Sequence, residues 1–148
     1  MNVSELLQSG AKVLRLNRIE THQLDSELVL SNLLKKQREN LIINLNLKVS
    51  ETTVLNFKNL INRRAKREPL AYILRNKEFW SKDFLVNRNT LIPRPETELL
   101  CENIIKIFRK KNLYMLDMGT GSGCIILSIL TELNKAKGVG VDISKTAI

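Results

Sequence analysis

Three glycines alternate with Thr and Ser in a short segment between two apolar runs. The segment is LDMGTGSGC, Leu116 to Cys124, and its glycines are Gly119, Gly121 and Gly123. Glycine has no Cβ, so such a loop can turn sharply and let a ligand touch the backbone. If a helix follows, its first N–H groups and the positive end of its dipole face the same place. The segment therefore predicts a binding loop for a nucleotide-like cofactor.

The spacing of these glycines narrows the choice of cofactor. A phosphate-binding P-loop requires GxxxxGK[ST], which the chain lacks. The dinucleotide fingerprint is GxGxxG, and Cys124 stands where its third glycine would be. The remaining pattern, GxGxG, is the spacing usual in S-adenosylmethionine (SAM) methyltransferases. A dinucleotide-dependent oxidoreductase stays open as a remote alternative.

An acidic residue further along strengthens this prediction. Asp142 ends the next apolar run, GVGVD, where a carboxylate can accept hydrogen bonds from both hydroxyls of a ribose. For Asp117 we favour a structural role at the start of the loop. The residues predicted to bind the cofactor are Gly119, Thr120, Gly121, Ser122, Gly123 and Asp142. No metal ligands are predicted, because Cys101 and Cys124 form no CxxC or Cys/His cluster.

The loop must be positioned by alternating strands and helices. Pro95 suits the first turn of a helix, and an apolar stripe of Leu100, Ile104, Ile107 and Phe108 follows. LYMLDM then predicts a short buried strand, CIILSILTEL a helix, GVGVD a second strand and ISKTAI the start of another helix. Strand, glycine loop, helix and strand form a βαβ unit, so the fold class is α/β with a parallel sheet.

Residues 1–68 read as helices. Ser4 is the predicted first N-cap, and a second helix around Leu24 to Leu34 would turn Leu24, Leu28 and Val29 inward. ENLIINL predicts a short third helix or turn. Ser50 is predicted to cap a further helix that carries the stripe Val54, Phe57, Leu60 and Ile61 and stops at Pro69.

Short aromatic or branched runs follow between residues 69 and 92. AYIL, KEFW and FLVN are separated by polar residues, which is typical of a small hairpin. The sequence therefore predicts an N-terminal helical bundle, a hairpin linker and the start of an α/β domain.

Composition limits the class of protein. The 148 residues are 43% hydrophobic and carry a formal net charge of +9, which is concentrated in residues 1–92. There is no apolar run of about 18 residues, and the first ten residues do not resemble a secretory signal, so we expect a cytoplasmic protein. The densest basic run is RRAKRE, Arg63 to Glu68. We favour a solvated helix face over a nucleic-acid site there, because no aromatic residues interleave with the cations.

A longer segment resembles a known family. EPLAYILRNKEFWSKDFLVNRNTLIPRPETELL, Glu68 to Leu100, is similar to the corresponding stretch of the release factor glutamine methyltransferases, the PrmC/HemK family. LDMGTGSGCI resembles their cofactor motif, VGVDISKTAI their second-strand segment and, more loosely, LDSELVLSNLL their small helical domain.

The resemblance implies an activity and a domain plan. Such enzymes transfer a methyl group from SAM to the side-chain nitrogen of the glutamine in the Gly-Gly-Gln motif of class I peptide chain release factors. The implied domains are a helical substrate-binding domain over residues 1–68, a hairpin linker over 69–92 and the start of a Rossmann-like SAM-dependent methyltransferase domain over 93–148. The partner is the release factor, with no membrane or direct nucleic-acid contact expected. Pro93 to Glu98 matches a conserved wall beside the cofactor.

The chain departs from the family pattern in two respects. Arg75 stands where family members usually have a glycine, which typically serves a positive φ. The family's catalytic Asn-Pro-Pro-Tyr motif does not occur among the 148 residues, so no catalytic residue is predicted here. Two predicted strands are also fewer than a doubly wound sheet needs. We therefore expect the N-terminal portion of a longer enzyme, inactive alone, or alternatively a fragment that only binds release factors.

Overall fold

The computed structural model describes residues 1–147 and divides the chain into two compact units, residues 1–74 and 75–148. The first unit is helical, and the second combines two small sheets with helices. This order of helices followed by strands agrees with the expected α/β class. The Rossmann-like completion of the sheet and the domain boundaries at residues 68 and 92 stay predictions.

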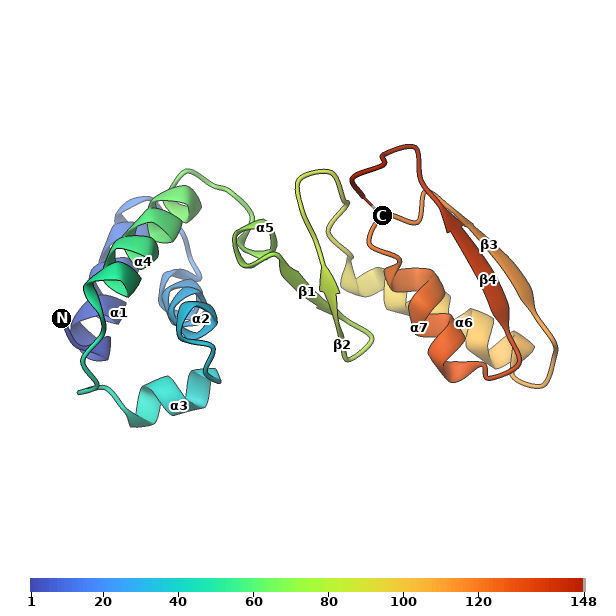
Figure 1. Ribbon diagram of the computed structural model, residues 1–148, viewed down its shortest axis with the longest axis horizontal. Helices are drawn as coiled ribbons and strands as arrows, with labels where there is room; N and C mark the ends of the chain where they lie inside the picture. Colours follow the sequence, from blue (N-terminus) through green and yellow to red (C-terminus); the bar gives the residue numbers. More distant parts are fainter. Residues whose placement is uncertain (148) are drawn as a thin grey trace. The chain divides into compact units, whose positions relative to one another are not determined.

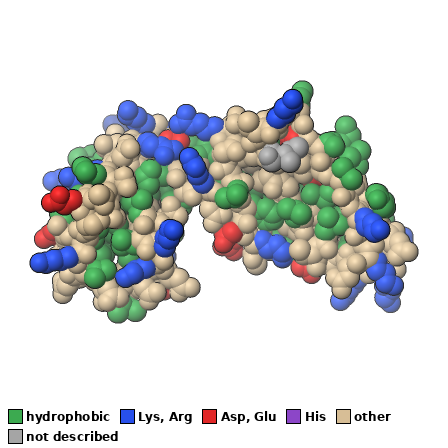
Figure 2. Space-filling view, in the orientation of Figure 1, with side chains coloured by type: hydrophobic (Ala, Val, Ile, Leu, Met, Phe, Trp, Pro, Cys, Tyr) green, Lys and Arg blue, Asp and Glu red, His purple; other side chains and the backbone are tan. Residues whose placement is uncertain are grey.

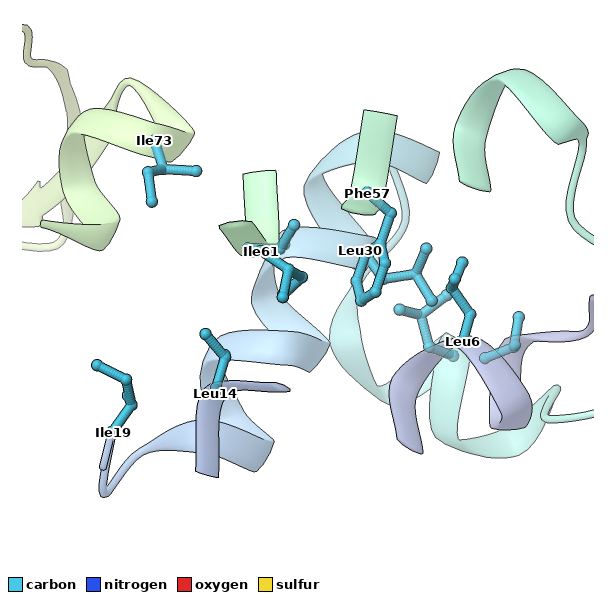
Figure 3. Close-up of a cluster of buried hydrophobic side chains, with 10 residues drawn as sticks. Leu6, Leu14, Ile19, Leu30, Phe57, Ile61 and Ile73 are labelled. Carbon is cyan, nitrogen blue, oxygen red and sulfur yellow. The ribbon is translucent and has the colours of Figure 1, made fainter. Parts of the chain in front are cut away.

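Five helices form the first unit. They are α1 (Val3–Leu16), α2 (His22–Leu34), α3 (Arg38–Ile43), α4 (Glu51–Ala65) and α5 (Leu70–Leu74) (Figure 1). Their apolar faces enclose a core to which α1, α2 and α4 contribute most (Figure 3). Its buried members include Leu6, Leu14, Leu30, Leu41, Phe57 and Ile61. The helices expected in residues 1–68 are therefore confirmed, including the short third one.

The N-cap of α4 was predicted correctly from the sequence, and the N-cap of α1 was not. Ser50 caps α4 as expected, because its hydroxyl accepts a hydrogen bond from the backbone of Thr53 at 3.2 Å. The prediction of Ser4 for α1 is wrong. Asn2 is the N-cap, and it forms a capping box in which its side chain accepts from Glu5 N at 2.8 Å. The Glu5 carboxylate accepts the Asn2 N–H in return, so two free donors are satisfied at once.

Helix α1 approaches its neighbours closely at one glycine. A Cβ placed on Gly10 would lie 2.6 Å from Phe57 Cζ and 2.7 Å from Ser26 Oγ. Gly10 is itself buried, and the Ser26 hydroxyl donates to the carbonyl of Leu7 at 3.0 Å. The absence of a side chain at residue 10 therefore lets α2 and α4 pack against the same turn of α1.

Helix α2 turns a polar face inward, which the apolar pattern did not predict. Leu24 is 40% exposed, so its expected inward position is wrong, whereas Asp25 and Glu27 are buried. Each carboxylate pairs with an arginine of another helix. Arg64 Nε lies 2.7 Å from Asp25 Oδ2, and Arg38 Nε lies 2.7 Å from Glu27 Oε2. Buried carboxylates are tolerated because these partners compensate the loss of hydration.

The basic run Arg63 to Glu68 is largely engaged in intramolecular hydrogen bonds and ion pairs. Arg63 forms two hydrogen bonds with Glu68, at 2.7 and 2.8 Å, while Arg64 pairs with Asp25 and Arg67 Nη2 donates to Asn17 O at 2.9 Å. Three of its cations therefore anchor α4 and the chain that follows, which supports the structural interpretation. Helix α4 ends at Ala65, so the expectation that Pro69 stops it is wrong. Pro69 instead precedes α5, and its carbonyl accepts from Tyr72 N at 3.1 Å.

The second unit begins with a hairpin. Strands β1 (Asn76–Phe79) and β2 (Lys82–Leu85) pair antiparallel around a two-residue turn, Trp80 and Ser81, which both have φ +53°. Positive φ at both turn positions matches the twist of the flanking strands. AYIL lies in α5, so its assignment to the hairpin is wrong. Arg75 has φ +57°, which confirms that this position takes the conformation usually left to glycine.

The rest of this unit contains the expected βαβ unit. A 3₁₀ turn (η1, Pro95–Thr97) leads into α6 (Glu98–Phe108), then β3 (Tyr114–Met118), α7 (Cys124–Glu132) and β4 (Lys137–Val141). Strands β3 and β4 are parallel, with Leu116 opposite Val139. Helices α6 and α7 pack around a core whose buried members are Phe79, Phe84, Cys101, Cys124, Ile129 and Leu133.

Several details differ from the sequence-based expectation. Strand β3 is not buried, because Tyr114 and Met118 are each 78% exposed. Figure 2 shows that hydrophobic side chains (green) reach the surface of the second unit. On α6, Leu100 and Ile107 are exposed, and Cys101 is the fully buried residue. The segment expected to start a helix after β4 forms a turn over residues 145–147, and Ile148 lies outside the described residues. Among residues 1–147 no helix is both long and apolar enough to cross a membrane.

Candidate functional site

The glycine loop joins β3 to α7 and is fixed to the end of the neighbouring strand. The backbone N–H groups of Gly119 and Thr120 both donate to the carbonyl of Val141, at 2.8 and 3.0 Å. Gly123 N donates to Thr120 O at 2.8 Å and closes the turn that leads into the helix. The loop therefore lies at the carboxyl ends of two parallel strands, where ligands bind in open α/β sheets.

The three glycines adopt conformations that side chains disfavour. Gly119, Gly121 and Gly123 have φ of +80°, +54° and +74°. A Cβ on Gly119 or Gly121 would meet no described atom within 4 Å, while one on Gly123 would lie 3.2 Å from Leu127 Cδ1. Glycine is therefore required at residues 119 and 121 by the backbone conformation, and the missing side chains leave open space beside the loop. A ligand can approach the backbone there, as the sequence predicted for such a loop.

Asp142 is hydrogen-bonded to the glycine loop. Its Oδ1 accepts from Ser144 N and its Oδ2 accepts from Gly121 N, both at 2.9 Å. The N–H groups of Ser144 and then Gly121 lower the pKa of this carboxyl below its ordinary value, because they stabilise the charged form. Each carboxylate oxygen has lone pairs beyond the one used here, so an ionised Asp142 can still accept hydrogen bonds from two hydroxyl groups.

A side-chain hydrogen bond between Thr120 of the loop and Asp117 of β3 holds the loop in place. Thr120 Oγ1 donates to Asp117 Oδ2 at 2.8 Å, so the carboxylate at the end of β3 orients the loop, as favoured from the sequence. Thr120 in turn packs over Gly140, where an added Cβ would lie 2.8 Å from Thr120 Oγ1. Sequence reasoning missed Gly140. The signal available was the repetition of glycine at alternate positions in GVGVD, on one face of a strand.

Ser122 and the first residue of α7 complete the loop. Gly123 occupies the N-cap position without a side-chain cap, so α7 presents its positive end beside the loop. The thiol of Cys124 is buried beside the Ser122 hydroxyl, and burial raises the pKa of this thiol. A protonated, buried thiol is a poor nucleophile, so Cys124 serves packing. In residues 1–147 no cluster of three or more His, Cys, Asp or Glu side chains could hold a metal ion.

The segment Pro93 to Glu98 has a structural connection that sequence reasoning did not find. Glu98 Oε1 accepts a 2.7 Å hydrogen bond from Trp80 N, and the Trp80 indole donates to Glu132 Oε1 at 3.1 Å. Glu98 therefore holds the positive-φ turn of the hairpin against α6. The role of Pro93 to Glu98 as a wall beside a cofactor stays a prediction.

The six predicted cofactor residues thus lie in one short region at the end of β3 and β4. This region can bind the diol of a ribose through Asp142 and approach the rest of a nucleoside cofactor through the bare backbone of Gly119 and Gly121. It contains no histidine or lysine that could act as a general base, since its titratable groups are the carboxyls of Asp117 and Asp142 and the buried thiol of Cys124. Both carboxyls accept hydrogen bonds from the loop or the chain beside it, an arrangement that suits the binding of a cofactor.

Comparison with known proteins gives matches over both units. Residues 5–74 match the family model of the PrmC N-terminal domain. The release factor glutamine methyltransferase of Buchnera aphidicola subsp. Schizaphis graminum (strain Sg) is 38% identical over 148 residues, which are 100% of this chain and 53% of that protein. The release factor glutamine methyltransferase of Nitratidesulfovibrio vulgaris is 37% identical over 143 residues, 97% of this chain and 48% of that protein.

A second group of relatives has another name. The bifunctional methyltransferase of Rickettsia prowazekii (strain Madrid E) is 34% identical over 166 residues, which cover 99% of this chain and 32% of that protein. The chain spans about half the length of the release factor glutamine methyltransferases that it matches. The chain is thus similar to the release factor glutamine methyltransferases along its whole length, and its residues 5–74 match the PrmC N-terminal domain.

Proposed function

We propose that these 148 residues form the part of a SAM-dependent methyltransferase that binds the cofactor's ribose and recognises a class I peptide chain release factor. The observation that carries the proposal is the hydrogen bond between Gly121 N and Asp142 Oδ2, 2.9 Å, beneath open space at Gly119 and Gly121. Similarity to the release factor glutamine methyltransferases supports SAM as the cofactor and the Gly-Gly-Gln glutamine as the methylated residue. The domain assignment is that expected from the sequence: substrate binding by 1–68, a linker over 69–92 and cofactor binding from 93 onward.

Each residue of the candidate site has a definite role in this proposal. Asp142 accepts hydrogen bonds from the two ribose hydroxyls, and the Ser144 and Gly121 N–H groups, which lower its pKa, further favour its ionised form. Gly119 and Gly121 let the cofactor contact the backbone, and Thr120 and Ser122 form the rest of the loop. When bound, SAM supplies a methyl group on a sulfonium leaving group. The positive end of α7 beside the loop suits the carboxylate of the methionine part.

Methyl transfer to an amide also requires groups that orient the amide. An amide nitrogen is a poor nucleophile because its lone pair is delocalised, so catalysis depends on alignment with the methyl group. In the family this task belongs to the Asn-Pro-Pro-Tyr motif, which does not occur in the 148 residues. We therefore expect this stretch by itself to transfer no methyl group to a release factor.

A chimera tests the proposal directly. The 148 residues replace the matching 53% of the Buchnera relative, and transfer of labelled methyl from SAM to a class I release factor is measured. We expect activity in the chimera and none in the 148 residues alone. Asp142→Asn should raise the concentration of SAM needed for half-maximal rate about tenfold or more, since it weakens charge-assisted hydrogen bonds. Asp83→Asn, a hairpin substitution outside the site, is the matched control.

Three outcomes would contradict parts of the proposal. A folded chimera that binds the release factor without methylating it would favour the alternative of a module that only binds. Binding of NAD in preference to SAM would favour the dinucleotide alternative. Stoichiometric transfer by the 148 residues alone would overturn the expected need for the orienting motif. Retention of a release factor by residues 1–68 in a pull-down tests the role of the helical domain separately.

A further inference from the structure

A groove of about 600 Å³ lies within the helical unit, between α1, α2 and α3. One face of α1 lines it from end to end, since its contributing residues recur every three or four positions: Ser4, Leu7, Gln8, Ala11, Lys12 and Arg15. At a rise of 1.5 Å per residue this face is about 16 Å long, or about three helical turns. The groove is therefore elongated, and it is large enough for several side chains of a bound segment.

The floor of the groove is apolar and exposed. Leu7 and Ala11 of α1 are half-buried, and Ile42 and Leu45, which also line the groove, are 47% and 41% exposed. These side chains lie outside the main core of the unit, except for Leu7 at its edge. An apolar strip of this kind on a folded unit marks a surface that can gain free energy by being covered.

The rim of the groove is positively charged. Lys12 and Arg15 are exposed and form no salt bridge with another described residue. The single carboxylate among the lining residues, Glu27, is already engaged, because Arg38 Nε donates to it at 2.7 Å and Gln23 Nε2 at 3.3 Å. Glu27 is also buried, while the side chain of Arg38 remains 43% exposed. The uncompensated charge that faces a bound partner is therefore positive.

We propose that this groove binds an acidic amphipathic helix of a partner protein. The helix lays its apolar stripe on Ile42 and Leu45 and directs its carboxylates toward Lys12 and Arg15, which is the usual helix-in-groove arrangement. Charge complementarity then sets the orientation and speeds association. The inference rests on the proposed function for its source: a class I release factor is the protein expected to supply the helix. An RNA partner is less favoured because no Phe, Tyr or Trp side chain lines the groove for bases to stack on, and His22 is the single aromatic ring among the lining residues.

Binding of a synthetic helix to the 148 residues tests the groove itself. The probe is a fluorescent peptide of about 15 residues with Leu at helical spacing and Glu on both sides of that stripe. Two control peptides have the same composition in scrambled order, or Lys in place of Glu. We expect only the acidic amphipathic peptide to bind, and its affinity should fall between about 50 and 300 mM salt because exposed charges are screened.

Matched variants locate the binding. The double variant Lys12→Glu/Arg15→Glu and the floor variant Ile42→Asp should each weaken binding about tenfold or more. Two control variants, the double charge reversal Lys58→Glu/Lys66→Glu and Leu55→Asp, make changes of the same kind at exposed positions outside the groove, and they should change affinity less than twofold. Circular dichroism confirms that each variant is folded. Equal effects of groove and control variants, equal binding of the scrambled peptide, or preferential binding of an RNA 12-mer would each overturn the proposal.

The same variants measured with a class I release factor separate the two proposals. If the release factor binds and only the groove variants weaken this binding, both the groove proposal and the proposed function stand. If the release factor binds and all variants behave alike, the groove proposal fails and the proposed function stands. If the acidic peptide binds in the groove and the release factor does not bind at all, the groove proposal stands and its partner is a different acidic protein.

Discussion

The backbone N–H of Gly121 donates a 2.9 Å hydrogen bond to Asp142 Oδ2, which connects the glycine loop after β3 to the residue after β4. This bond joins the two halves of the candidate site across a sequence separation of 21 residues. Because the same carboxylate also accepts from Ser144, it fixes the loop and the chain after β4 together. The conformation of the loop therefore depends on the charge of Asp142.

Acidification should release this connection. The pKa of Asp142 in the folded protein lies below its ordinary 3.8, so the carboxylate contributes stability above about pH 4, and this contribution is lost as the pH falls through the lowered value. We expect the amide proton shift of Gly121, followed by NMR, to titrate with a midpoint below 3.8. The same titration should be absent in Asp142→Asn. A midpoint at or above 3.8 would contradict the hydrogen-bonded geometry.

Gly10→Ala should destabilise the helical unit. The added methyl group would lie 2.6 Å from Phe57 Cζ and 2.7 Å from Ser26 Oγ, so α2 or α4 must shift. Overpacking of this kind costs about 1–3 kcal/mol, which exceeds the gain in helix propensity from Ala. Urea denaturation gives the free energy of unfolding. Lys12→Ala on the exposed side of the same helix is the control, expected within about 0.5 kcal/mol of wild type.

Arg75→Gly should stabilise the second unit, which begins with the hairpin. Arg75 has φ +57°, which costs an L-residue about 1–2 kcal/mol, and part of that cost returns as the greater entropy of glycine in the unfolded chain. The expected net gain in unfolding free energy is about 0.5–1 kcal/mol. Arg109 has φ −49°, which any L-residue adopts, so Arg109→Gly is the opposite case and should lower the unfolding free energy. No gain for Arg75→Gly would show that the arginine makes a compensating contact.

Two buried serines should respond oppositely to replacement by alanine. Ser26 Oγ donates to Leu7 O at 3.0 Å, so Ser26→Ala loses a hydrogen bond worth about 1 kcal/mol. Ser128 is 0% exposed, and its hydroxyl has no partner among the described residues, so Ser128→Ala removes the cost of burying it. The unfolding free energy of the Ser128→Ala variant should equal that of the wild type or exceed it by about 1 kcal/mol. A loss at Ser128 as large as that at Ser26 would indicate an unseen partner, such as a bound water.

The second unit should lose stability in alkaline solution. Burial, and then the nearby Cys124 and Glu98, raise the pKa of the Cys101 thiol from 9.0 to about 11. The folded protein therefore keeps a proton that the unfolded chain releases, so stability is full below about pH 9 and falls as the pH rises toward 11. Unfolding measured at pH 8 and 10.5 should show the decrease, and Cys101→Ala should reduce it. A thiol that reacts with iodoacetamide in the folded protein at pH 8 would argue against this burial.

Local patterns predicted the elements that depend on neighbouring residues. Residue type and spacing within a few positions predicted the glycine loop, the strand before it and the helix after it. They also predicted the cap at Ser50 and the acidic residue Asp142 directly after β4. Backbone conformation at glycine, helix capping and alternation in strands are short-range effects, so the sequence alone is sufficient for them.

Tertiary contacts decided the rest. Asp25 and Glu27 are buried and Leu24 is exposed because Arg64, 39 residues away, and Arg38, 11 residues away, compensate the two carboxylates. AYIL is helical in α5, although its branched and aromatic residues favour strands in isolation. Gly140 is required because Thr120 of the loop packs on it. The burial of the two carboxylates depends on partners 39 and 11 residues away, which a pattern of neighbouring residues does not specify.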